Sequence, residues 1–160
     1  MGVDAICAAA GVSKRTLYQQ FGSKDQLVAT CLDTVGPAIL DRYAGGRAGP
    51  PLERITAVFT GLWQSASGEG FRGCAFINTA TDLADPAHPA RAVARAYKEQ
   101  LRDFFAATAR EGGARDPDKL AEQLLILFDG AMVTAQMGTV TSPDSTLDAV
   151  LALTSSGGLH

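Results

Sequence analysis

A short polar run near the N-terminus carries the side chains best suited to contacting a nucleic acid. Ser13, Lys14, Arg15 and Thr16 stand together, and Gln19 follows one helical turn after Arg15. Lysine and arginine pair with phosphates, while arginine, glutamine and hydroxyl side chains hydrogen-bond to base edges in the major groove. At the start of a helix, such a run predicts residues that read DNA. The alternative is a polar surface helix with no partner.

Residues for catalysis or metal binding form no comparable pattern. Cys7, Cys31 and Cys74 are odd in number and widely spaced, which disfavours a disulfide framework and a CxxC metal or redox site. We expect His88 to be a loop residue, and neither His88 nor His160 has the spacing of a metal ligand. The sequence contains no HExxH, phosphate-loop or Ser-His-Asp pattern. We therefore predict a protein that is not an enzyme and has neither a cofactor nor a metal.

Length and composition favour one folded helical protein. The 160 residues are 46% apolar and 19% charged, which is enough to build a hydrophobic core. Alanine is frequent and strand-like alternation is short, so we predict an all-α fold. The net charge of −3 argues against a generally basic nucleic-acid coat protein. Without a secretory signal or a long apolar run, the sequence predicts a cytoplasmic protein with no membrane partner.

The first part of the chain is predicted to form three helices separated by glycine turns. The first covers residues 3–10 and ends at Gly11. Ser13 is a suitable N-cap for the second helix, which Gly22 ends, and a third helix runs over about 24–43. This succession is typical of a helix-turn-helix.

Helical periodicity continues through the rest of the chain. Gly36-Pro37 predicts a kink or a break in the third helix, because proline lacks the backbone N–H. The end of the chain, TSSGGLH, is expected to be disordered. Between the third helix and this tail, further helices are predicted at about 52–65, 74–83, 89–110, 117–137 and 145–153.

The stretch from Ala8 to Leu27, AAAGVSKRTLYQQFGSKDQL, resembles the DNA-binding segment of the tetracycline-repressor (TetR) family of bacterial regulators. The matching features are an Ala-Gly-Val-Ser turn, a Thr-Leu-Tyr core, the following phenylalanine and a Ser-Lys-Asp start to the next helix. The resemblance implies that Tyr18 touches the DNA backbone and that Lys24 meets a phosphate. The predicted DNA-binding residues are thus Ser13, Lys14, Arg15, Thr16, Tyr18, Gln19 and Lys24.

Residues 72–91, RGCAFINTATDLADPAHPAR, are similar to a segment found in one branch of these regulators. The resemblance implies an effector pocket among the middle helices for an unknown small molecule. Aromatic and apolar side chains with a few polar groups are typical of such pockets, and ordinary core packing is the alternative for each of them. The candidate lining residues are Phe59, Trp63, Phe76, Asn78, Tyr97, Phe104, Phe128, Met132 and Gln136.

The resemblance also implies a homodimer, formed by the helices at about 117–138 and 145–153. The stretch 124–137 is apolar on more than one face, which independently calls for cover by a second subunit. We therefore interpret residues 1–32 as an N-terminal helix-turn-helix segment and residues 33–160 as a helical effector-binding and dimerisation bundle.

The predicted function is a ligand-responsive repressor. It binds a palindromic double-stranded DNA operator as a homodimer, and a small apolar or aromatic effector releases it by tilting the helix that holds Gly36-Pro37. The alternative role of Pro37 is simply to end one helix and start the next. Family members begin with a further helix ahead of this segment. The alternative function is therefore a helical small-molecule-binding or dimerising protein that no longer binds DNA because that helix is missing.

Overall fold

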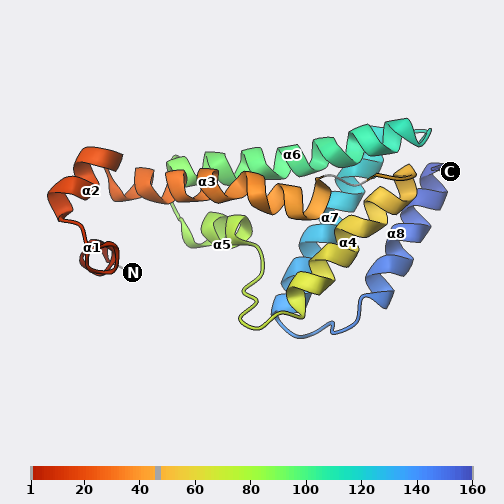
Figure 1. Cartoon of the computed structure of the whole chain (residues 1–160). Helices are drawn as coiled ribbons and strands as arrows, with labels where there is room; N and C mark the ends of the chain where they lie inside the picture. The colour runs from red at the N-terminus through yellow and green to blue at the C-terminus, as the bar shows by residue number, and fades with distance from the viewer. Residues whose placement is uncertain (1, 46–47, 160) are drawn as a thin grey trace.

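The computed structural model describes residues 2–45 and 48–159, and this part of the chain contains eight helices and no strand (Figure 1). The prediction of an all-α fold is confirmed, while His160 lies outside the described residues. No helix in the described part is long and apolar enough to cross a membrane. The helices are α1 (Val3–Ala10), α2 (Lys14–Phe21), α3 (Lys24–Ala44), α4 (Pro51–Ala66), α5 (Ala75–Asp82), α6 (Pro89–Glu111), α7 (Pro117–Gln136) and α8 (Asp144–Gly157).

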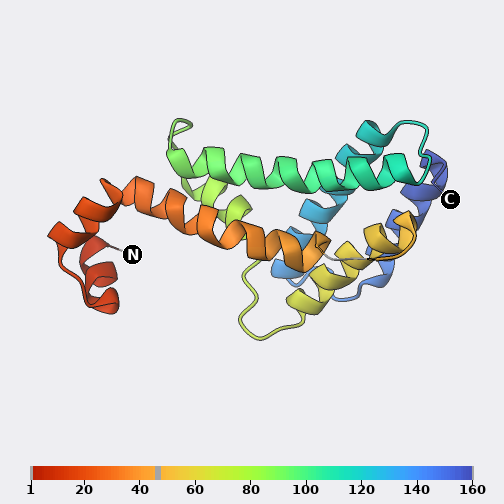
Figure 2. The same cartoon turned by 45° about the horizontal axis from the view of Figure 1, so that its top comes forward.

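Helices α1 and α2 lie beyond one end of the body formed by α4 to α8, and the long helix α3 joins the two (Figures 1 and 2). The buried hydrophobic residues accordingly form two separate clusters. Cys7, Leu17 and Leu27 form the small cluster between α1, α2 and the start of α3. The large cluster is centred on side chains such as Phe59, Leu101 and Phe128, which are inaccessible to solvent. We call α1, α2 and the first two turns of α3 the reading module.

Helix α3 continues past Pro37 as one 21-residue helix, so the chain does not break there. Pro37 has no N–H to donate to the carbonyl of Asp33, which leaves one hydrogen bond of the helix unmade. Packing offsets this loss, because α3 runs beside α6 in both views (Figures 1 and 2). A Cβ at the buried Gly36 would lie 3.6 Å from Cζ of Phe76, so the glycine brings the backbone of α3 close to that ring.

The C-terminal end is ordered by packing, and the expectation of a disordered tail is wrong for its described part. Helix α8 extends to Gly157, and Gly158 ends it with a left-handed φ of 81°. The N–H of Leu159 then donates to the carbonyl of Thr154 at 3.0 Å, and the Leu159 side chain is buried. The glycine pair thus ends the helix and turns an apolar side chain into the core.

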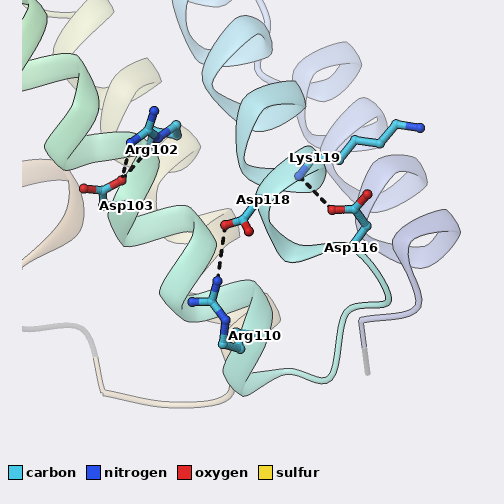
Figure 3. Close-up of polar contacts among 6 residues, drawn as sticks. All are labelled: Arg102, Asp103, Arg110, Asp116, Asp118 and Lys119. Carbon is cyan, nitrogen blue, oxygen red and sulfur yellow. Dashed lines mark hydrogen bonds and ion pairs between the residues drawn. The ribbon is translucent and has the colours of Figure 1, made fainter.

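Surface ion pairs add little to the joint between α6 and α7. Arg110 of α6 pairs with Asp118 of α7 at 3.2 Å, whereas Arg102 pairs with its own neighbour Asp103 at 2.7 Å (Figure 3). Exposed pairs of this kind contribute about 0–1 kcal/mol each. The joint therefore depends on the buried apolar side chains that the two helices share and on the partly buried ion pair of Lys98 in α6 with Asp129 in α7.

Candidate DNA-binding surface and effector cavity

A tight glycine turn sets α2 against α1. Gly11 has φ 66°, a left-handed conformation that a side chain disfavours, and the N–H of Val12 donates to the carbonyl of Cys7 at 3.1 Å. Ser13 then caps α2, its hydroxyl accepting the N–H of Thr16 at 3.1 Å. Leu17, the one buried residue of α2, anchors the helix to the small cluster.

Apart from Leu17 and the half-buried Phe21, which packs against the same cluster, the residues of α2 face solvent. All seven predicted DNA-binding residues are exposed, six of them at the cap or on the surface of α2 and Lys24 at the first position of α3. The hydroxyls of Ser13 and Thr16 bond each other at 2.9 Å, which holds both at the N-terminal end of α2. The structure therefore gathers the predicted residues on one exposed end of the molecule.

Asp4 is a part of this surface that the sequence pattern did not reveal. Its carboxylate lies 2.6 Å from Nζ of Lys14, and this hydrogen-bonded ion pair raises the pKa of Lys14 above its usual value. Ten residues separate the partners, so only the turn at Gly11 brings them together. Any phosphate that approached Lys14 would therefore compete with Asp4 for its ammonium group.

A half-open cavity of about 230 Å³ lies where α3, α4, α5, α6 and α7 meet. Three of the predicted pocket residues, Phe76, Tyr97 and Met132, line it. The rings of Phe76 and Tyr97 stack with centroids 3.8 Å apart and planes within 6°. Burial raises the pKa of Tyr97, with smaller contributions from Cys74 and Tyr43, so its hydroxyl stays protonated and can donate a hydrogen bond. The remaining lining residues are Ile39, Arg42, Tyr43, Ser65, Phe71, Gly73, Cys74 and Ala75.

Six predicted pocket residues lie elsewhere. Phe59, Trp63 and Phe128 are core side chains, and Phe59 packs against Phe128 edge to face with centroids 5.9 Å apart. Nε1 of Trp63 is buried with no hydrogen-bond partner among the described residues. Phe104 lines a separate surface hollow of about 320 Å³ beside Pro37.

Two of the polar residues predicted for the pocket, Asn78 and Gln136, instead contact the loop before α5. Asn78 donates from its amide to the carbonyl of Arg72 at 2.8 Å. The side chain of Gln136 lies against Gly73, where a Cβ would meet Oε1 at 2.2 Å. Gly73 also has φ 70°, so a side chain at this position would be both strained and blocked.

The contribution of α3 to the lining of the cavity was not predicted from the sequence. Ile39 and Tyr43 line it, and both lie on the same face of α3 as Gly36, at three and seven residues further along. That spacing was visible in the sequence, but the expected break at Pro37 separated these positions from Gly36.

An exposed polar helix on a helix-turn-helix, carried by a helical body, defines a DNA-binding transcriptional regulator. Two family descriptions match the chain, "Bacterial regulatory proteins, tetR family" over residues 1–31 and "Tetracyclin repressor-like, C-terminal domain" over residues 51–150. The chain belongs to the TetR family of transcriptional regulators and is not an enzyme.

Solved structures of regulators agree with this assignment. The TetR-type regulator SAV143 of Streptomyces avermitilis is 38% identical, with a TM-score of 0.92 over 100% of this chain and 88% of its own. SCO4454, a TetR-family regulator of Streptomyces coelicolor, is 28% identical, with a TM-score of 0.80 over 98% and 82% of the two chains. The reduced form of Escherichia coli NemR is 20% identical and shares the fold, with a TM-score of 0.81 over 94% and 84%. A comparison with curated proteins gave no match.

Proposed function

We propose that the protein is a ligand-responsive repressor that binds a palindromic operator as a homodimer and is released by a small apolar or aromatic effector. The observation that carries the proposal is the course of α3. Its first residue, Lys24, lies at the predicted DNA surface, and Ile39 and Tyr43 near its other end line the cavity. One helix therefore touches both sites, so a ligand that favours another position of α3 would shift the reading module as well.

An apolar face on α7 supports the homodimer. Ile126 and Met137 are 72% and 69% exposed, and Val133, also exposed, lies between them on the same side of the helix. Leu151 of α8 is a further exposed apolar residue, and Gly130 leaves open space in the middle of the α7 face. An apolar stripe of this length is typical of a contact surface, and a two-fold copy would place two reading modules on one DNA.

The cavity supports the effector class. Its walls include the aromatic rings of Phe71, Phe76 and Tyr97 and the flexible Met132. Hydroxyl and thiol groups lie between them, and Arg42 of α3 contributes a charged group to the lining. Engineered apolar cavities of about 150 Å³ bind benzene, so about 230 Å³ accommodates a one- or two-ring molecule with a polar substituent.

The experiment for DNA binding is a selection from a random duplex library, with enriched sites retested by fluorescence anisotropy. Enrichment of a palindrome is expected. Arg15→Ala should then weaken binding about tenfold, the effect of one lost base contact. Arg102→Ala, at a partly exposed arginine of α6 outside the reading module, is the matched control and should leave affinity unchanged. Weak binding without sequence preference would favour the alternative, a ligand-binding or dimerising protein that does not read DNA.

The effector part is tested on the protein–operator complex with benzene, p-cresol and indole as probes. Release of the complex by at least one of them is expected. Met132→Phe, which fills the cavity from α7, should abolish the release and preserve operator binding. Equal release from the variant would place the effector site elsewhere.

A further inference from the structure

His88, at the start of α6, contacts the reading module. Its Nε2 lies 3.3 Å from Oδ1 of Asp25, which belongs to the first turn of α3. The His88 side chain is 9% exposed and the Asp25 side chain 62%, so the imidazole is packed into the body and the carboxylate reaches it from the surface. Asp25 directly follows Lys24, the predicted phosphate contact.

The other nitrogen of the ring fixes its protonation pattern. Nδ1 of His88 accepts the N–H of Ala90 at 3.1 Å and so caps the N-terminus of α6. A nitrogen that accepts carries no hydrogen in the neutral ring, so Nε2 bears the hydrogen, and it is this nitrogen that lies 3.3 Å from the Asp25 carboxylate. A single side chain therefore caps one helix and holds the start of another.

The segment between α5 and α6 that carries His88 is fastened to the body. The Arg91 guanidinium donates to the carbonyls of Ala80 and Leu83 at the end of α5, the second at 2.7 Å. The Asp85 carboxylate accepts the N–H of Ala87 at 2.8 Å, and the Asp85 carbonyl accepts that of His88 at 3.2 Å. These bonds give His88 a fixed position from which to hold Asp25.

No other ion pair or hydrogen bond among the described residues joins residues 2–31 to the helices after α3. The small and the large hydrophobic clusters are also separate, although Ala29 and the partly buried Val28, in the first two turns of α3, pack into the large one. The angle between the reading module and the body is therefore set by α3, by this apolar packing and by the His88–Asp25 contact.

We propose that His88 is a positioning residue for DNA binding: its contact with Asp25 helps to fix the angle of the reading module and hence the half-site spacing that the dimer accepts. This inference rests on the proposed homodimer and palindromic operator. A dimer carries two such contacts, one beside each recognition helix, and half-site spacing must match the separation of those helices. With the contact present, one spacing is favoured; without it, the modules sample a wider range and bind the preferred spacing less tightly.

The decisive variant is His88→Asn in the full chain. Asparagine is a good N-cap and keeps the bond to Ala90, but its side chain is too short to reach Asp25. Asp25→Asn is the matched control, because its amide oxygen keeps an oxygen atom in contact with Nε2 while the charge is removed. Asp25→Ala removes the contact from the other side, and its combination with His88→Asn completes a double-mutant cycle.

Each protein is titrated by anisotropy against the selected palindrome and against the same half-sites with one base pair inserted or deleted. We expect His88→Asn to weaken binding to the selected spacing about five- to tenfold, from two exposed contacts per dimer, and to affect the altered spacings less. Asp25→Asn should keep the parent's preference for one spacing. Asp25→Ala and the double variant should show the same relaxed preference as His88→Asn.

The outcomes separate the two proposals. A parent-like spacing profile for His88→Asn, in a protein whose parent selects a palindrome, overturns the positioning role alone. A parent that selects no palindrome overturns the proposed function and this inference together. Unfolding followed by the fluorescence of Trp63, the single tryptophan, shows whether each variant keeps its body. Should His88→Asn fail to fold, Asp25→Ala, at a largely exposed side chain, gives the same test.

Discussion

At the scale of single residues, Asp4 occupies the ammonium of Lys14, a predicted DNA contact. Because its carboxylate pairs with Lys14, a DNA phosphate would compete with it for that ammonium. Asp4→Asn should therefore strengthen binding to a scrambled duplex about two- to fivefold at low salt, and less at high salt. Anisotropy over a salt series measures this. Asp103→Asn, which frees Arg102 on α6 in the same way, is the control and should change nothing (Figure 3).

Tyr97 links the cavity to the pH dependence of stability. Burial raises its pKa above the value of an exposed tyrosine, so the folded protein holds this proton more tightly than the unfolded chain does. The stabilisation is complete below the unfolded pKa of about 10 and is lost as the pH rises further, by about 1.4 kcal/mol per pH unit. Urea unfolding above about pH 10 measures the free energy of unfolding of the parent and of Tyr97→Phe. We expect this pH-dependent loss in the parent and not in the variant. Tyr18→Phe, at an exposed tyrosine, should behave like the parent.

At the scale of elements, α3 has a position where a larger side chain should help. Gly36 lies in the interior of the helix, and a Cβ there would meet Phe76 at an ordinary contact distance of 3.6 Å. Gly36→Ala should raise the free energy of unfolding by about 0.5–1 kcal/mol, because alanine loses less backbone entropy in a helix. Chemical denaturation monitored at Trp63 measures the change. A loss of stability would mean that α3 and the Phe76 ring are packed too closely for even one added carbon.

The sequence predicted those elements whose ends are decided locally. Helices α1, α2, α4, α6 and α7 begin and end within one or two residues of their predicted bounds, since serine, proline and glycine mark their ends. The continuity of α3 and the length of α8 depend on distant partners, the ring of Phe76 and the core around Leu159. The hydrophobic periodicity of one segment does not show which distant side chains will pack against it.

The same distinction holds for the candidate sites. The DNA-binding residues could be proposed together because they are consecutive or one turn apart on a single capped helix. The cavity could not, because its lining comes from five helices and a loop, and an aromatic residue in a helix has the same periodicity in a core as in a pocket. The contacts of Lys14 with Asp4 and of Asp25 with His88 join residues 10 and 63 positions apart in the chain, and only the folded structure shows them.

At the scale of the whole molecule, the exposed apolar face of α7 predicts that two copies of the chain associate through it. Ile126 and Met137 are large, apolar and exposed, and a second copy of the chain would bury both together with Leu151. We expect the parent to be a dimer in sedimentation velocity and Ile126→Asp to be a folded monomer, because a buried carboxylate without a partner is strongly unfavourable. Val35→Asp, at an exposed valine of α3, should remain a dimer.

The monomeric Ile126→Asp variant also tests whether dimerisation is needed for tight binding to the palindrome. A dimer brings two reading modules to one operator, so loss of the second should reduce affinity for the selected palindrome to nearly that of a single half-site. Binding to a scrambled duplex, which needs only phosphate contacts, should fall much less. Anisotropy on the two duplexes compares these effects directly. If Ile126→Asp stayed dimeric, or bound the palindrome as tightly as the parent, the α7 face would not be the surface that pairs the reading modules.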